Sequence, residues 1–297
     1  MRFGGRVRVQ SGALLLAATL IGGVAFAAPS DELTMCVENE LTYTSADHVP
    51  AVCLPPRSES VGYPWRGRLE HGKRLIESDH VRLVPSEAAR GYLYGTEELV
   101  TLLHAVAGRV AESFPGFRMS VGELSKPEGG WIGGHNSHRN GRDADVGLYV
   151  VNQHGEPGLG ERFVAINGAG DGRAWPYEQW RFHDAANWTL LRELSQATEA
   201  PVQHVFVSLG LQSRLINEAR RQGESDEVIE RARRMMRQPE AGSPHDNHFH
   251  VRIFCAPGDR PRCVDRGPFW SWYLASIGLP TEWGVDMAEN SDLPALP

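Results

Sequence analysis

Histidines are concentrated in two short segments that are far apart in the chain. Five of the twelve histidines fall within residues 133–145 and residues 244–250. Neutral imidazoles together with a carboxylate are the ligands that a borderline divalent cation such as Zn²⁺ accepts. Because such an ion holds its ligands at about 2 Å, a shared site would require the fold to bring these two distant segments into contact. This requirement constrains the fold more than any other feature of the sequence.

The second segment leads into a predicted strand. Residues 248–254 alternate between polar and apolar side chains, and side chains in a strand point alternately to its two faces. His248, His250 and Arg252 would therefore share one face. The opposite face is apolar and is expected to pack on the core, so that two imidazoles project side by side from a rigid element.

The first segment supplies the carboxylate. We expect a strand over residues 145–150 that Asp145 opens, and His138 lies seven residues earlier, beyond a turn that Gly141 can make. Two imidazoles and one carboxylate leave a fourth position for water, which is the arrangement typical of catalytic zinc. A further histidine beside the ligands can move protons, and Arg252 or another cation can stabilise a developing oxyanion.

Each of these residues also has a simpler interpretation. Asp143 and Asp145 can end a turn or cap a strand, and a metal can stabilise a fold without doing chemistry. An isolated His-x-His pair is weak evidence, but together with the upstream segment it favours a catalytic metal. The remaining histidines are interpreted as structural or surface residues: His48, His71, His80, His104, His154, His183 and His204.

The amino terminus has the pattern of a secretory signal peptide over residues 1–27. Three arginines (Arg2, Arg6 and Arg8) precede an apolar run over residues 12–24, and Ala25-Phe26-Ala27 forms a small-x-small cleavage site. The run is shorter than the roughly 20 residues of a spanning helix, so we expect cleavage, export and no stable membrane insertion. Removing three basic residues changes the formal charge from −7 to −10. With no long basic stretch, this balance argues against nucleic-acid binding.

All four cysteines follow the predicted cleavage site. An oxidising compartment favours pairing them, and four cysteines allow three connectivities. The shortest loops are closed by Cys36 with Cys53 and by Cys255 with Cys263. A zinc held by four thiolates is the alternative, but the Cys-x-x-Cys spacing is missing, so we favour these two disulfides.

Hydrophobic periodicity and capping signals predict one α+β domain with a small central antiparallel sheet flanked by helices. Residues 28–60 are expected to form an irregular wrap, and residues 61–297 the main domain. The expected helices span residues 96–114, 184–196, 209–221 and 225–237, and the other expected strands span residues 117–124 and 202–207. Three arginines close the last helix (Arg233, Arg234 and Arg237). We interpret them as a solvated helix end rather than as a site for an anionic partner.

Around its two histidine segments the sequence resembles the penicillin-insensitive murein endopeptidases. These enzymes belong to a superfamily with lysostaphin-type enzymes, D-Ala-D-Ala metallopeptidases and hedgehog domains. The resemblance covers about residues 60–270. It is carried by Ser137-His138-x-x-Gly141-x-x-x-Asp145 and His245-x-x-His248-x-His250, with weaker signals at Gly129-Gly130, Asp184-x-x-Asn187-Trp188 and Val205-Phe206-Val207. It implies a fold like that of the hedgehog and D-Ala-D-Ala-peptidase domains.

The resemblance also implies roles for individual residues. His138, Asp145 and His250 would bind zinc, His248 would be the catalytic acid and base, and His135 and His245 would line the site. The implied substrate is the D-Ala–meso-diaminopimelate cross-link of peptidoglycan, cut in the periplasm by metal-activated water. A zinc D,D-carboxypeptidase or dipeptidase and a wall-binding module without catalysis remain the alternatives. The sequence does not indicate the oligomeric state.

Overall fold

The computed structural model describes residues 35–37, 52–54, 56–158, 160–174, 178–239 and 243–282. Contacts divide the chain into two units, residues 1–57 and residues 58–297. The predicted signal peptide (residues 1–27) and most of the predicted wrap (residues 28–60) lie outside the described residues. In the first unit, β1 (Met35–Val37) pairs antiparallel with β2 (Val52–Leu54), and Cys36 lies directly opposite Cys53. The side chains of this pair are not described, so the Cys36–Cys53 disulfide remains a prediction.

The second unit is organised by a six-stranded sheet. Its strands are β6 (Val81–Leu83), β8 (Met119–Val121), β9 (Asp143–Gly147), β13 (Val202–Phe206), β14 (Met236–Arg237) and β15 (His248–Ile253). They lie in the order β14-β13-β15-β9-β8-β6. The four central strands pair antiparallel with one another, whereas at the two edges β14 runs parallel to β13 and β6 runs parallel to β8.

The α+β class is confirmed, but the expectation of an antiparallel sheet was wrong at both edges. Parallel neighbours need a crossover connection, which is usually helical. Helices supply both crossovers: two lie between β13 and β14, and a one-turn helix and a long helix lie between β6 and β8. The sequence predicted the three long helices without indicating which strands they connect, and it did not predict the one-turn helix.

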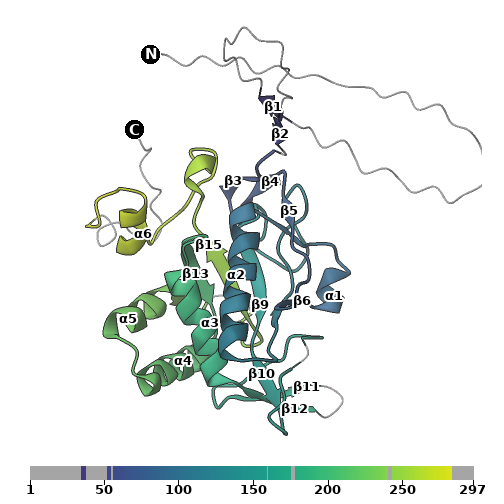
Figure 1. Cartoon of the computed structure of the whole chain (residues 1–297), viewed down its shortest axis with the longest axis vertical. Coiled ribbons are helices and arrows are strands. Elements are labelled where there is room, and N and C mark those ends of the chain that lie inside the picture. The colour runs from purple at the N-terminus through teal and green to yellow at the C-terminus, as the bar shows by residue number, and fades with distance from the viewer. Residues whose placement is uncertain are drawn as a thin grey trace, which may run out of the picture. The chain divides into compact units, whose positions relative to one another are not determined.

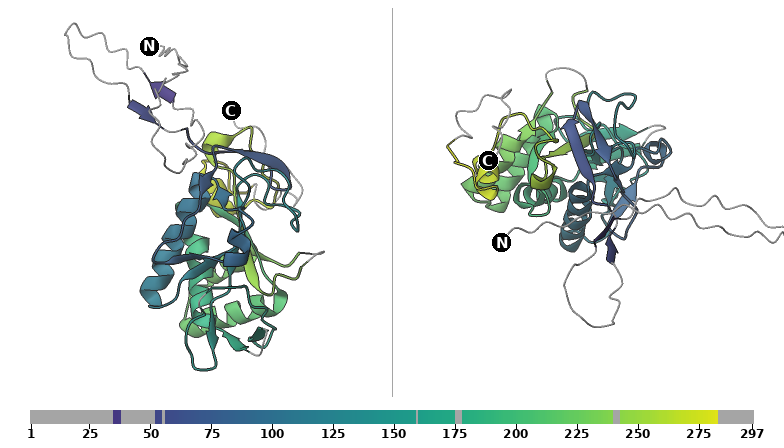
Figure 2. Two further views of the ribbon diagram at one scale, coloured as in Figure 1. Left: turned by 90° about the vertical axis from the view of Figure 1, so that its right-hand side faces the viewer. Right: turned by 90° about the horizontal axis from the view of Figure 1, so that it is seen from above.

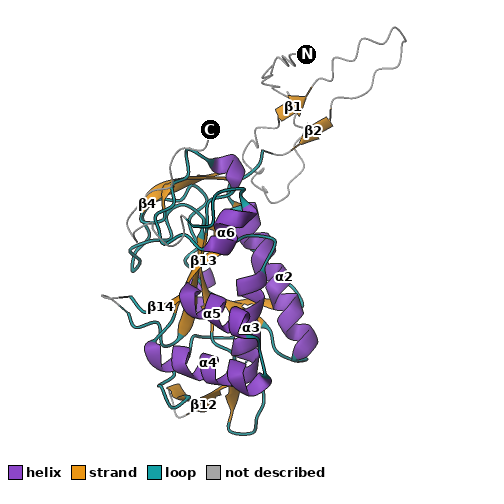
Figure 3. Ribbon diagram, turned by 90° about the vertical axis from the view of Figure 1, so that its left-hand side faces the viewer, coloured by secondary structure: helices purple, strands orange, loops and turns teal. Residues whose placement is uncertain are grey.

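The long helices lie against one face of this sheet (Figures 1 and 3). They are α2 (Glu97–Ser113), α3 (Asp184–Gln196), α4 (Leu209–Gln222) and α5 (Asp226–Met235), each within a few residues of its predicted bounds. Thr96 caps α2 by accepting a hydrogen bond from the Leu99 N–H, and Ser225 caps α5 in the same way. The apolar stripe of α2 is buried, and it joins a core that includes the apolar faces of β9 and β15.

Short elements surround this framework (Figure 2). The hairpin β3 (Glu59–Tyr63) and β4 (Arg66–Glu70) is followed by β5 (Lys73–Arg74), α1 (Pro85–Ala88) and β7 (Tyr94–Gly95). A separate sheet contains β10 (Val150–Asn152), β11 (Asp171–Ala174) and β12 (Glu178–Phe182). Toward the carboxyl terminus lie a 3₁₀ turn (Pro257–Asp259) and α6 (Ser271–Ser276). The predicted Cys255–Cys263 disulfide is confirmed. Among the described residues, no helix has the length and apolar composition to span a membrane.

The strand predicted over residues 145–150 was wrong at both ends. β9 begins two residues earlier, at Asp143, because Asp143 still pairs with Arg252 of β15. It ends at Gly147 because the backbone beyond it is bound by a side chain instead of a neighbouring strand. The amide of Asn187 accepts from the Tyr149 N–H at 2.9 Å and donates to the Tyr149 carbonyl at 2.7 Å.

The core makes a direct prediction about stability. Leu103 lies on the buried stripe of α2, whereas Leu209 at the start of α4 is 61% exposed. Leu103→Ala should lower the free energy of unfolding by about 2–5 kcal/mol, because it leaves a cavity as well as losing buried area. The matched substitution Leu209→Ala should change it by less than about 0.5 kcal/mol. Urea unfolding followed by circular dichroism measures both, and equal effects would contradict the burial described here.

Candidate metal centre

Two neighbouring strands, β9 and β15, supply most of the candidate site. Their antiparallel register places His250 opposite Asp145, His248 opposite Gly147 and Arg252 opposite Asp143. Because side chains alternate along a strand, the polar residues of both strands share the face away from the core. The predicted grouping of His248, His250 and Arg252 on one face is therefore present, and β9 adds two carboxylates beside it.

His138 reaches the same face from a loop. The turn expected at Gly141 is present, with a positive φ of 78°, and a Cβ there would lie 2.6 Å from Leu69. The hydroxyl of Ser125 fixes the loop by donating to the His138 carbonyl at 2.7 Å and accepting from the Gly141 N–H at 3.0 Å. His138 itself has a φ of 62°, a left-handed conformation that costs a non-glycine residue about 1–2 kcal/mol.

Four imidazoles converge on the carboxylate of Asp145. Its Oδ1 lies 3.2 Å from His138 Nε2, 3.4 Å from His248 Nε2 and 3.5 Å from His250 Nδ1, and its Oδ2 lies 3.8 Å from His135 Nδ1. The ring of His245 is centred 4.9 Å from that of His248. The fold thus gathers all six residues to which the resemblance assigned a role in the site.

The imidazoles of His138 and His250 are each held by a hydrogen bond at the nitrogen that points away from Asp145. His138 Nδ1 lies 2.8 Å from the Leu124 carbonyl, to which it donates its hydrogen. His250 Nε2 lies 3.0 Å from Asp143 Oδ1, which accepts from it. A hydrogen on each outer nitrogen leaves a lone pair on the nitrogen that faces Asp145, as is usual for histidines that bind a metal.

The other two imidazoles have outer partners as well. His135 Nε2 lies 2.5 Å from Glu123 Oε2, and His248 Nδ1 lies 2.6 Å from Asn247 Oδ1. Glu123 gave no signal in the sequence, because it reaches His135 only through the fold of the intervening loop. Asn247 could have been found, since it directly precedes His248.

Burial and neighbouring charges oppose each other in this cluster. Burial raises the pKa of Asp145, but His138 and His248 outweigh it, so the pKa lies well below the usual value. Burial likewise raises the pKa of Asp143, and Arg252 and His250 hold it well below the usual value. Burial lowers the pKa of His138, yet Asp145 leaves it raised overall. For His250 burial prevails and lowers the pKa to about 4 despite the Asp143 hydrogen bond.

The cluster fits a divalent cation. His138 Nε2 and Asp145 Oδ1 are buried and have no hydrogen-bond partner, although buried polar atoms are nearly always paired. One ligand atom from each of His135, His138 and Asp145 lies within 4.8 Å of the others. Nitrogen and carboxylate donors in this number suit zinc or a similar ion. A positive ion placed here would satisfy both unpaired atoms.

A cleft of about 460 Å³ opens beside the cluster. The residues that line it include Trp65, Phe206, His245, His248, His250 and Arg252. Trp65 was missed in the sequence, because it comes from the β3–β4 hairpin and nothing in its neighbourhood marks it. The cleft is large enough to admit part of a peptide to the histidines.

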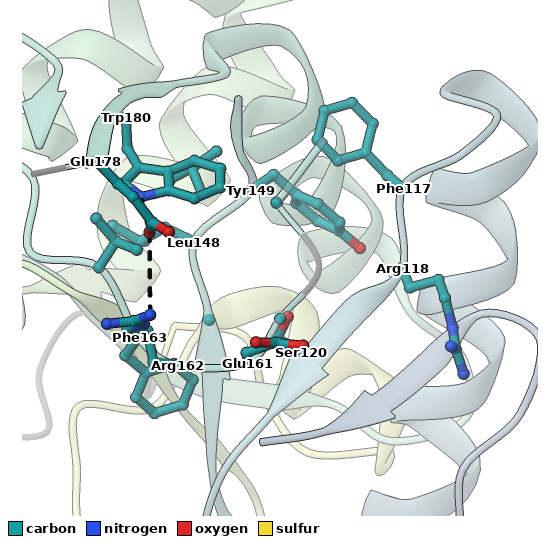
Figure 4. Close-up of a pocket in the computed structure, with 15 residues that line it drawn as sticks. Phe117, Arg118, Ser120, Leu148, Tyr149, Glu161, Arg162, Phe163, Glu178 and Trp180 are labelled. Carbon is teal, nitrogen blue, oxygen red and sulfur yellow. Dashed lines mark hydrogen bonds and ion pairs between the residues drawn. The ribbon is translucent and has the colours of Figure 1, made fainter. Parts of the chain in front are cut away.

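A second, smaller cavity of about 150 Å³ adjoins the site through Phe163 (Figure 4). The ring of Phe163 lines this cavity and also stacks on His248, with ring centroids 5.2 Å apart. Tyr149 and Trp180 line it as well, and Arg162 faces Glu178 across it at 3.9 Å. Phe163 thus fixes one side of the His248 ring.

The lowered pKa of His250 predicts how stability depends on pH in the metal-free protein. Between pH 6.5 and about 4, the unfolded chain binds a proton at this residue that the folded chain does not, so stability is lost as the pH falls. His250→Gln should reduce the slope by up to about 1.4 kcal/mol per pH unit, whereas the exposed control His154→Gln should not. Urea unfolding in chelator across this range measures the slopes, and identical slopes for the parent and His250→Gln would refute the assignment.

Comparison with known proteins agrees with this geometry. The sequence profile of the penicillin-insensitive murein endopeptidase family matches residues 60–271. A penicillin-insensitive murein endopeptidase from Shigella boydii serotype 18 is 24% identical over 252 residues, which cover 82% of this chain and 85% of that protein. One from Haemophilus influenzae is 26% identical over 234 residues, covering 76% and 66%. The profile match takes in more than half of the chain and includes both histidine segments, so the chain belongs to the penicillin-insensitive murein endopeptidase family.

Proposed function

We propose that this protein is a zinc-dependent murein endopeptidase that hydrolyses the D-Ala–meso-diaminopimelate amide in peptidoglycan cross-links. Membership of the family and the names of the relatives support the reaction and the polymer. The observation that carries the proposal is the convergence of imidazole lone pairs on one buried carboxylate with an unpaired oxygen. A signal peptide over residues 1–27 would deliver the enzyme to the periplasm, where this substrate lies.

His138, Asp145 and His250 would hold the zinc. His138 and His250 turn their unprotonated nitrogens toward Asp145 because Leu124 and Asp143 bind the opposite nitrogens. His135 is the other candidate ligand, but its nitrogen is farther from Asp145, at 3.8 Å, so we place it at the edge of the site with His245. Once bound, zinc supplies Lewis acidity and makes water a nucleophile near neutral pH.

His248 would move the proton. Its Nδ1 is held by Asn247, and its ring contacts those of Phe163 and His245. Its Nε2 faces Asp145, and the residue lines the cleft. A general base must lie within reach of the proton it takes, and its orientation must be fixed. The fixed orientation of His248 and its place in the cleft lining support this role. It would accept the proton of the attacking water and return it to the leaving amine.

Arg252 would support the reaction in two ways. Its Nε donates to Asp143 Oδ1 at 2.6 Å, so it helps to fix the carboxylate that orients His250. It also lines the cleft, where a guanidinium favours negative charge developing on the scissile carbonyl oxygen.

Digestion of a purified cross-linked muropeptide dimer tests the function. The parent protein should release monomers, a chelator should abolish the activity, and Zn²⁺ should restore it. Release of free D-Ala without monomers would instead identify a carboxypeptidase, and binding without any cleavage would identify a wall-binding module. Either result, analysed by liquid chromatography and mass spectrometry, would overturn the proposed reaction.

Two substitutions separate the proposed roles. His250→Ala should abolish both zinc binding and hydrolysis, because it removes a ligand. His248→Ala should abolish turnover and leave most of the zinc bound, as measured by metal analysis after dialysis. His154→Ala, at an exposed histidine outside the cleft, is the control and should behave like the parent. If His248→Ala released monomers at the parent rate, its role would be wrong.

The carboxylate behind His250 gives a further prediction. Asp143→Asn keeps the shape of the side chain but weakens the acceptor for His250 Nε2, so zinc affinity should fall about 10–100-fold. Competition with a chelating dye measures this change. Asp171→Asn, on the exposed strand β11, is the control. An unchanged affinity in Asp143→Asn would show that His250 is not oriented through this contact.

A further inference from the structure

The position opposite His248 in the sheet has no side chain. The antiparallel pairing of β15 with β9 sets His248 against Gly147. Residues directly opposite each other on one face of a sheet have Cβ atoms about 5 Å apart and normally pack on each other. Because Gly147 has no Cβ, strand pairing alone would leave one side of the His248 ring without a neighbour.

The ring of Phe163 occupies this space. Phe163 belongs to the loop between β10 and β11, and its ring stacks on that of His248, with planes inclined by 22°. A Cβ built on Gly147 would lie 3.0 Å from Phe163 Cε1 and 3.1 Å from Cδ1. Phe163 therefore takes the place of the missing cross-strand side chain, although it comes from a different part of the chain.

A second glycine makes room for the same ring. Gly122 directly follows β8, and a Cβ built on it would lie 2.7 Å from Phe163 Cζ and 2.9 Å from Cε2. Neither Gly122 nor Gly147 has a positive φ, so the backbone does not require glycine at either position. What requires the absence of a side chain at both is the ring of Phe163. We call Gly122 and Gly147 the glycine pair.

The loop that carries Phe163 is tied to the strand that carries His248. The neighbouring side chains of Val164 and Ile166 are buried in the core. The Ile166 N–H also donates to the Asp246 carbonyl at 2.8 Å, two residues before His248. The loop and the start of β15 are thus held together on both sides of the stacked rings.

The stack restrains His248 in a way that its hydrogen bond does not. Asn247 Oδ1 binds the ring at Nδ1, 2.6 Å away, and this contact fixes one atom of the imidazole. A ring held at one atom can still tilt about it. The stacked Phe163 restrains the plane, and together the two contacts determine where Nε2 points, 3.4 Å from Asp145 Oδ1.

From this packing we infer that Phe163 is a positioning residue for the proposed reaction, because it holds the ring plane of His248 in the orientation that proton transfer needs. The inference rests on the proposed function for the role of His248. Phe163 has no group that could take part in the chemistry, and it acts only through His248. An apolar side chain from the loop between β10 and β11 would therefore control turnover.

A split between kcat and KM tests this role. In the zinc-loaded protein, Phe163→Leu should lower kcat for a cross-linked muropeptide dimer by about 10- to 100-fold, because a misplaced general base loses rate. KM and bound zinc should not change. Phe117→Leu is the matched control: Phe117 lines the same cavity of about 150 Å³ and contacts another imidazole, that of His183, with centroids 5.0 Å apart. A parent-like kcat in Phe163→Leu, or a raised KM alone, would overturn the inference.

The glycine pair allows the ring to be displaced without being removed. Gly122→Ala should push the Phe163 ring aside and lower kcat, whereas Gly108→Ala, whose Cβ would lie 3.7 Å from the nearest His80 atom, should not. Once the ring is absent, the methyl group has nothing to displace. The double variant Gly122→Ala/Phe163→Leu should therefore be no slower than Phe163→Leu alone. Losses that multiply would show two independent effects and contradict the inference.

Ring motion separates this inference from the proposed reaction. Nuclear magnetic resonance relaxation of ¹³C-labelled histidine rings in the full chain with Zn²⁺, with the His248 signal identified by its loss in His248→Ala, measures the order of that ring. The order should fall in Phe163→Leu and not in Phe117→Leu. An unchanged order would reject the inference even if the parent protein cleaves the dimer. A lowered order in a protein without hydrolysis would reject the proposed function and leave the restraint on His248 in place.

Folding is checked by circular dichroism for every variant. If Phe163→Leu is unfolded, Gly122→Ala replaces it in the kinetic and the relaxation measurements, with the same expected outcomes, because it perturbs the same stack by displacing the ring.

Discussion

The antiparallel pairing of β9 with β15 is the constraint on which the site depends. This pairing sets Asp145 opposite His250 and Asp143 opposite Arg252. Because side chains alternate with a period of two, a slip of one residue would move all of these groups into the core and the apolar residues into the cleft. The helices on the other face, by burying Val146, Phe249 and their neighbours, therefore fix the register as well as stabilising the fold.

Holding two buried carboxylates beside each other requires compensation. Asp143 accepts hydrogen bonds from the His138 backbone, His250 and Arg252, so its charge is satisfied within the protein. Asp145 differs, because its Oδ1 faces nitrogens that lack the geometry of a hydrogen bond. An unpaired buried oxygen destabilises a fold. The contrast between the two neighbours distinguishes a carboxylate that orients the site from one that is available to an ion.

Local rules predicted much of this from the sequence. Alternation placed His248, His250 and Arg252 on one face, the glycine at 141 marked the turn that brings His138 back, and capping residues located α2 and α5. The rest depended on contacts between distant residues. Three features leave no periodic pattern in the sequence, because each forms only after the chain has folded. They are the parallel edges of the sheet, the end of β9 before the backbone that Asn187 binds, and the pairing of Glu123 with His135.

The way in which the loop that carries His138 is held has a consequence for the proposed metal site. Ser125 and Asp143 anchor this loop through its backbone, and none of those hydrogen bonds involves an imidazole. Small zinc modules, by contrast, are unfolded until the metal binds. In this protein the chain itself makes the hydrogen bonds that hold the loop. Under the proposed function, an ion would therefore be bound by side chains whose backbone is positioned by other residues.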